Sequence, residues 1–258
     1  MEGKQILTIA AVFVLGAVTS GWCQGPPIEI LQTRSDAPAP GGSSTSGSSG
    51  GITDPVGAES SSTVDARVTA TSPEDLVRRA KRLYRKYGPV IQKALDAATL
   101  PEIQIKVTYD PKAYPGVTDG NVVTLSYPWF CSHKDDGAII HEFAHVLQGR
   151  MRYDDETSWL VEGLADCIRA AIEPSLELRS SGFHPEFQPG GAKLGYQTTA
   201  HFLTWLGKKI RPGGVKALTR ALRSTSYTHD EFTKYYGKTL EVLVRGYEKS
   251  FGAKSVKA

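Results

Sequence analysis

Two histidines and a glutamate near the middle of the chain have the spacing of a metal site. His141 and His145 are four residues apart, so on a helix of about 3.6 residues per turn both imidazoles leave the same face and can share one ion. Glu142 follows the first histidine, where a carboxylate can take a proton from a metal-bound water without binding the metal itself. The pattern predicts one catalytic zinc ion (Zn2+), with Glu142 as the general base of a metallopeptidase.

A second segment supplies the missing ligand. A catalytic zinc ion needs three protein ligands and one open position. Glu162 and Asp166 are also four residues apart, so a second helix presents two carboxylates on one face. We predict that Glu162 is the third ligand, and that Asp166 accepts the free ring N–H of a ligating histidine and fixes its tautomer. Asp166 is the alternative third ligand.

The His-Glu-x-x-His spelling alone is weak evidence, because it also occurs by chance in unrelated chains. The competing interpretation is a pair of solvated histidines beside a surface glutamate. Apolar residues surround the motif on nearly every face of the predicted helix, which indicates that this helix is buried. These residues are Ala138, Ile139, Ile140, Phe143, Ala144, Val146 and Leu147. Buried histidines and a buried glutamate need partners, and this favours the metal site.

The composition and the first residues bound the class of protein. A chain of 258 residues with 40% hydrophobic content can bury one good core, and its net charge of +3 predicts no nucleic-acid partner. Residues 1–24 have the charged start, short apolar run and small residues of a secretory signal peptide. An uncleaved membrane anchor is the alternative, and Trp22 disfavours lipidation of Cys23. We expect a secreted, extracellular or periplasmic protein without stable membrane insertion after signal removal, with cell-surface attachment as an alternative.

Residues 25–71 are rich in Pro, Gly and Ser, which predicts a disordered linker. No internal repeat is visible, so we assign a single folded domain to residues 72–258. Of the cysteines, Cys131 and Cys167 lie in this domain. In an exported protein they could form a disulfide, and two separately buried thiols are the equal alternative.

The domain begins with a helix signal. Ser72 is a good N-cap, and Pro73 suits the first helical position. Apolar residues follow at helical spacing until Gly88 and Pro89, which predict a break before a second helix at residues 90–98.

A small sheet is predicted next. Residues 103–109 alternate between apolar and polar types, as in a half-buried strand. Asp119 and Gly120 indicate a tight turn, and residues 121–126 form the strand that returns from it. This strand comes just before the metal helix, so it could be an edge that pairs with an extended peptide substrate, with a purely structural role as the alternative.

The remaining elements are predicted to be helical. Asp135 or Asp136 caps the metal helix, Gly149 ends it as a left-handed cap, and Pro174 closes the helix of Glu162. Later helices are expected from Tyr196 onward, at 215–222 and at 240–251.

Four stretches in the same order resemble the basic secretory protein family of peptidases from plants and bacteria. They are His-Glu-Phe-Ala-His-Val-Leu-Gln at 141–148, Trp-Leu-Val-Glu-Gly-Leu-Ala-Asp-Cys-Ile-Arg at 159–169, residues 195–205 and residues 236–243. The similarity spans roughly residues 100–252. The resemblance implies a zincin-like α+β fold, mostly helical with a small N-terminal β-sheet, and a secreted metal-dependent peptidase that acts on a peptide or protein substrate. We expect it to be a monomer.

The segment around Glu162 also resembles the one that carries the glutamate ligand of gluzincin aminopeptidases, which favours Glu162 over Asp166. The gap of 17 positions between His145 and Glu162 is shorter than in those enzymes. Tyr196 is a candidate donor to the oxyanion of the tetrahedral intermediate, and a packed aromatic is its alternative. Two other functions remain open: a non-catalytic zincin-like module that binds a surface, and a zinc hydrolase of a non-peptide amide.

Overall fold

The structure is a computed structural model that describes residues 69–173, 183–224 and 226–252. The predicted signal peptide, most of the predicted linker and Pro174 lie outside the described residues. Ala70, at the end of the predicted linker, is buried in the core and donates its N–H to the carbonyl of Phe130. Within the described ranges, no helix is long and apolar enough to cross a membrane.

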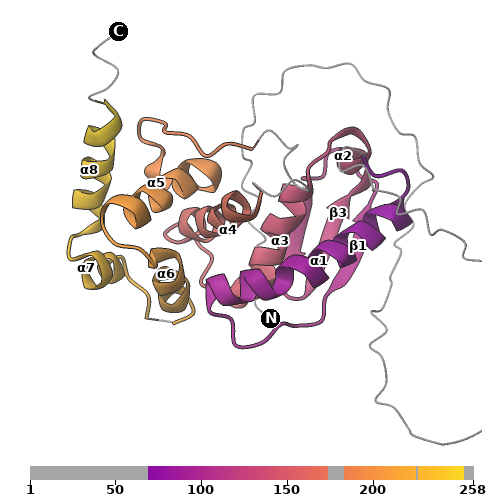
Figure 1. Ribbon diagram of the computed structural model, residues 1–258, viewed down its shortest axis with the longest axis horizontal. Coiled ribbons are helices and arrows are strands. Elements are labelled where there is room, and N and C mark those ends of the chain that lie inside the picture. The colour runs from indigo at the N-terminus through magenta and orange to yellow at the C-terminus, as the bar shows by residue number, and fades with distance from the viewer. Residues whose placement is uncertain (1–68, 174–182, 225, 253–258) are drawn as a thin grey trace, which may run out of the picture.

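The described chain is a mixed α+β protein, mostly helical with a three-stranded sheet (Figure 1). In chain order its elements are α1 (Pro73–Leu95), β1 (Gln104–Thr108), β2 (Gly116–Asp119), β3 (Val122–Ser126), α2 (Tyr127–Ser132), α3 (Asp136–Gln148), α4 (Ser158–Ile172), η1 (Gly191–Lys193), α5 (Tyr196–Lys209), α6 (Gly214–Leu222), α7 (Asp230–Tyr236) and α8 (Leu240–Gly252).

Helix α1 begins as predicted but does not break. The Ser72 hydroxyl accepts the N–H of Asp75 at 3.1 Å, which caps the helix. The prediction of two helices separated at Gly88-Pro89 is wrong, because α1 continues through Pro89. Its apolar face stays buried on both sides of the proline, at Tyr87 and Ile91. Continuous burial of this face offsets the cost of an interior proline, which sequence propensity alone cannot weigh.

The sheet has the order β1-β3-β2, with β1 parallel and β2 antiparallel to β3. It follows α1, so the expectation of an N-terminal sheet is wrong. The turn at Asp119-Gly120 is confirmed, and the strand that it joins to β3 is β2, which sequence analysis missed. The prediction that residues 121–126 form an exposed edge is also wrong, because β3 is the central strand. The edge beside the candidate site belongs to β2, which packs against α3.

Helix α4 lies between two hydrophobic clusters and contributes to both. One of its faces joins α1, the sheet and α3 through Ala165, Ile168 and Ile172. The other face joins α5 to α8, with Leu160 and Leu164 among its buried residues. In Figure 1, α4 accordingly sits between α3 on one side and α5 on the other. Helix α3 packs against α4 and α1. Because both sides of α4 are covered by packed helices, its position is strongly constrained.

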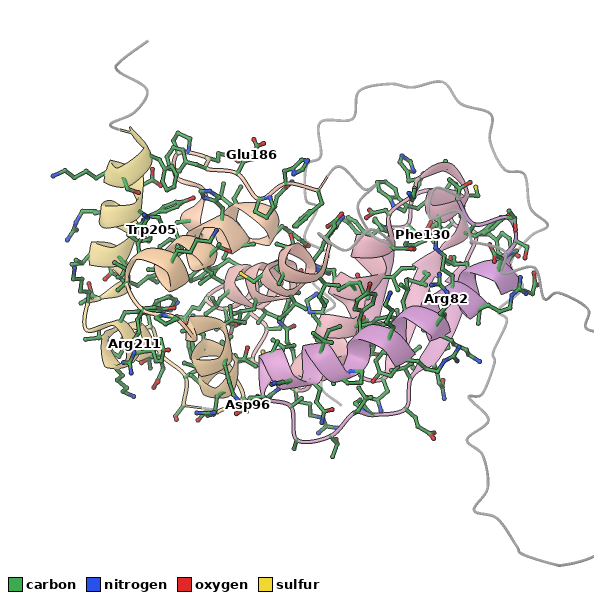
Figure 2. The ribbon with its side chains drawn as sticks, viewed as in Figure 1. Arg82, Asp96, Phe130, Glu186, Trp205 and Arg211 are labelled. Carbon is green, nitrogen blue, oxygen red and sulfur yellow. The ribbon has the colours of Figure 1, made fainter. Side chains whose placement is uncertain are left out.

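The C-terminal half confirms the predicted helices from Tyr196, at 215–222 and at 240–251 to within a few residues, whereas α2 and α7 were not predicted. Trp205 of α5 lies between α5 and α8 in Figure 2, and its ring meets that of Tyr247 with centroids 5.6 Å apart. Cys131 and Cys167 are not joined by a disulfide. They are two separate thiols, with Cys167 buried and Cys131 only partly buried. The Cys131 thiol lies 3.4 Å from the carbonyl of Pro128.

Replacing Pro89 with alanine tests the continuous helix. We expect a gain of about 1 to 2 kcal/mol in the free energy of unfolding, because removing an interior helix cost of about 3 kcal/mol outweighs about 1 kcal/mol of lost unfolded-state restriction. Urea unfolding measures this. The control is Val90→Ala at an exposed neighbouring position, expected to change stability by less than about 0.5 kcal/mol. A Pro89→Ala protein less stable than the wild type would contradict a continuous helix.

Candidate metal centre

The structure brings His141, His145 and Glu162 together between α3 and α4. The Nε2 atoms of the two histidines are 3.0 Å apart. Oε2 of Glu162 lies 3.1 Å from Nε2 of His141 and 3.3 Å from Nε2 of His145. His141 and Glu162 are buried, and His145 is largely so. These three ligand atoms all lie within 4.8 Å of one another, so the group could hold a metal ion.

The outer ring nitrogens of both histidines are held by acceptors. Nδ1 of His141 is 2.7 Å from Oδ1 of Asp166, and Nδ1 of His145 is 2.7 Å from Oε1 of Gln148. The amide nitrogen of Gln148 donates to the carbonyl of Val161, which fixes the orientation of its side chain. We therefore assign the proton of each neutral ring to Nδ1.

This tautomer decides whether the residues fit a metal. With both protons on Nδ1, two bare Nε2 lone pairs and a carboxylate oxygen converge on the same buried space. Three electron-pair donors at such separations repel one another unless a cation, either a proton or a metal ion, lies among them. Two imidazoles and one carboxylate are a donor set of catalytic zinc sites, so the residues fit the metal. Asp166 contacts Nδ1 of His141 and does not belong to the converging group.

Charged contacts hold the first turn of α3 in place. Asp135 is its N-cap and accepts the N–H of Ala138, and Arg169 of α4 donates to the same carboxylate oxygen at 2.7 Å. Arg79 of α1 pairs with Asp136 at 2.7 Å. Because these pairs are partly buried and bind α3 to both neighbouring helices, they fix where His141 points relative to α4. Gly149 ends α3 with φ +67° and ψ −145°, outside the left-handed helical conformation that we expected.

Glu142 contacts strand β2 and is not one of the three converging ligands. The hydroxyl of Thr118 donates to Oε2 of Glu142 at 2.7 Å. Gly116 allows β2 to approach closely, because a Cβ there would lie 2.6 Å from Cγ of Glu142. Sequence analysis missed both contacts, since a four-residue strand containing glycine has too little periodicity to be recognised.

Two tyrosines lie beside the group. Tyr196, the predicted oxyanion donor, opens α5 with φ +46°, and its ring stacks on His141 with centroids 6.0 Å apart. Tyr153 was not predicted. Its hydroxyl donates to Oε1 of Glu162 at 2.7 Å from the loop between α3 and α4. No sequence signal could have found it, because a loop residue has no period that relates it to the helices.

The charges of the group set its protonation in the absence of a metal. Burial alone would lower the pKa of both imidazoles, but the carboxylates of Asp166 and Glu162 raise the pKa of His141 well above its usual range. Glu162 likewise raises the pKa of His145. Burial opposes ionisation of Glu162, yet the two histidines hold its pKa well below its usual range. Without a metal, these charges favour the protonated form of the histidines beside an ionised Glu162.

Fold and site define an α+β protein whose packed helices present a buried His, His and Glu group that could hold a metal ion. Residues 116–247, just over half of the chain, match the family model BSP, described as a peptidase of plants and bacteria. The chain therefore belongs to this peptidase family, as the resemblance predicted. Neither the curated proteins nor the solved structures searched contain a match.

The metal-free protein should lose stability as the pH rises above neutrality. The raised pKa of His141 and of His145 contributes stability that is complete below about pH 6.5 and lost as pH rises through the folded-state values. The lowered pKa of Glu162 contributes stability above about pH 4.5. His141, His145 and Glu162 should therefore stabilise the metal-free protein most between about pH 4.5 and about pH 6.5.

Urea unfolding of chelator-treated protein, from about pH 4.5 to well above neutrality, measures the effect. The Asp166→Asn variant, which removes one charge that raises the pKa of His141, should show a shallower decline above neutrality. An equally steep decline in both proteins would show that other groups are responsible.

Proposed function

We propose that this protein is a secreted zinc-dependent metallopeptidase with a zincin-like catalytic domain at residues 72–258. Membership of the peptidase family supports a peptide or protein substrate. The observation that carries the proposal is the convergence of His141, His145 and Glu162 in a buried space, where their electron pairs need a cation. The signal-peptide pattern of residues 1–24 supports export. The protein would act as a monomer and without a nucleic-acid partner.

His141, His145 and Glu162 would hold one zinc ion, which when bound supplies a Lewis acid that polarises a peptide carbonyl and lowers the pKa of water. Asp166 and Gln148 act on the two histidines by accepting their Nδ1 protons, which keeps both Nε2 atoms available as ligands.

Glu142 would be the general base. It takes a proton from the attacking water and returns it to the leaving amine. The Thr118 hydroxyl bonds to Oε2 of Glu142, which holds this oxygen and leaves Oε1 as the one that accepts the proton. Glu142 also lies near enough to His145 to raise the pKa of that imidazole, so the base is next to the converging group without belonging to it.

Strand β2 would hold the substrate. In the described chain β2 is an edge strand, because it pairs with β3 and with no second strand, and it also packs against α3. An extended peptide could pair with the outer edge of β2, next to Glu142. Val117, 53% exposed on this strand, offers apolar contact to the peptide. Tyr196 stacks on His141 and is 37% exposed. Its hydroxyl would donate to the oxyanion of the tetrahedral intermediate.

The direct test compares the full-length protein with Glu142→Gln, measuring bound zinc and casein hydrolysis. We expect stoichiometric zinc in both proteins and a loss of at least about 100-fold in kcat for the variant. Zinc without hydrolysis of casein or other peptides by the wild type would favour the non-catalytic binding module. Hydrolysis of small amides alone would favour a non-peptide substrate, and absence of bound zinc would refute the proposal.

Placing a methyl group between β2 and Glu142 should misplace the base without removing the metal. In Gly116→Ala the new Cβ would approach Cγ of Glu142 to 2.6 Å, so the carboxylate must shift. We expect kcat to fall about 100-fold, as a misplacement of about 1 Å can cause, with unchanged zinc content. Gly120→Ala is the matched control for loss of a glycine in the same hairpin, because a Cβ there meets nothing within 4 Å. Its positive φ of 57° predicts a loss of stability only. Equal kcat values in the two variants would contradict this role of Gly116.

A further inference from the structure

The loop between α3 and α4, residues 149–157, is exposed in large part yet internally bonded. Oδ1 of Asp154 accepts the N–H of Glu156 at 3.0 Å and that of Thr157 at 3.2 Å. The Thr157 hydroxyl donates to the carbonyl of Arg152 at 2.7 Å. The Arg152 guanidinium pairs with the carboxylates of Asp154 and Glu156. These bonds close the loop on itself around residue 153.

The loop is also anchored to the C-terminal half of the protein. The indole N–H of Trp159 donates to the carbonyl of Glu156 at 2.7 Å, and Nε2 of His229 lies 3.3 Å from the same oxygen. The Arg152 guanidinium also donates to the carbonyl of Tyr227 at 3.5 Å, so contacts on both sides of residue 153 give this segment a defined position. The side chain that this position directs at the metal centre is Tyr153.

The two carboxylate oxygens of Glu162 have different partners, and the hydroxyl of Tyr153 is the partner of one of them. It donates to Oε1 at 2.7 Å, while Oε2 faces the two histidine Nε2 atoms at 3.1 and 3.3 Å. Tyr153 is 55% exposed, so packing contributes little to holding the ring there. The hydrogen bond to the carboxylate is therefore the main contact that accounts for its position.

We infer that Tyr153 is a positioning residue that restricts Glu162 to binding the metal through one oxygen. The inference rests on the proposed metal site. Without the phenol, Oε1 loses its partner and the carboxylate can turn both oxygens toward the ion. A two-oxygen carboxylate would then occupy the position that a catalytic zinc site keeps open for water and substrate. A hydrogen-bond partner such as Tyr153 also orients the ligating carboxylate, so its loss should lower the affinity for the metal.

The test is Tyr153→Phe, which removes one hydroxyl from a largely exposed ring. Two measurements do not depend on turnover: zinc affinity by competition with a chelator, and the visible absorption of the cobalt-substituted protein. We expect zinc affinity to fall about tenfold. The absorption should also weaken, because five-coordinate cobalt absorbs less strongly than four-coordinate cobalt. Tyr196→Phe is the matched control, since it removes the hydroxyl of a tyrosine that stacks on His141. It should leave both measurements unchanged.

A second variant tests the loop. Asp154→Ala removes the carboxylate that orders residues 152–157, and it should change affinity and spectrum in the same direction as Tyr153→Phe. Wild-type affinity and spectrum in Tyr153→Phe would overturn the inference while leaving the metallopeptidase intact. A wild-type protein that binds neither zinc nor cobalt would overturn the metal site and the role of Tyr153 with it.

Discussion

The meeting of two imidazole nitrogens and a carboxylate oxygen in one buried space is the constraint on which the site depends. Their electron pairs are compatible with burial only if a cation lies among them. The acceptors at Asp166 and Gln148 point both lone pairs inward. The ion pairs of Asp135 with Arg169 and of Asp136 with Arg79 prevent α3 from turning to relieve the repulsion. These charged contacts thus all help to position the same three ligands.

Helix α4 positions Glu162 in this site. The helix gives one face to the cluster with α1 and the sheet and the other to the cluster with α5 to α8, and it carries Glu162 and Asp166 between them. Gly163 allows α5 to approach closely, since a Cβ there would lie 2.1 Å from the side chain of Thr199. Close packing on both faces leaves α4 little freedom to move. Precise placement of Glu162 therefore follows from core packing, whereas Glu142 depends on the edge strand β2.

The sequence predicted the candidate site correctly where ligand-type residues occur at helical spacing. The four-residue spacings of His141 with His145 and of Glu162 with Asp166 predicted which side chains share a helix face, because a helix fixes that geometry locally. Prediction failed where tertiary packing decides. Burial of one face carried α1 through Pro89, and the sheet order made β3 the central strand. Tyr153 could not be found, because only the fold brings its loop to Glu162.

The most direct test of the central claim is a crystal structure of the zinc-soaked protein, with anomalous differences collected on both sides of the zinc absorption edge. We predict one strong peak bound by Nε2 of His141, Nε2 of His145 and Oε2 of Glu162, with Asp166 still bonded to Nδ1 of His141. A peak bound by Asp166 in place of Glu162 would contradict the assignment of the ligands. Absence of a peak between α3 and α4 would contradict the account as a whole.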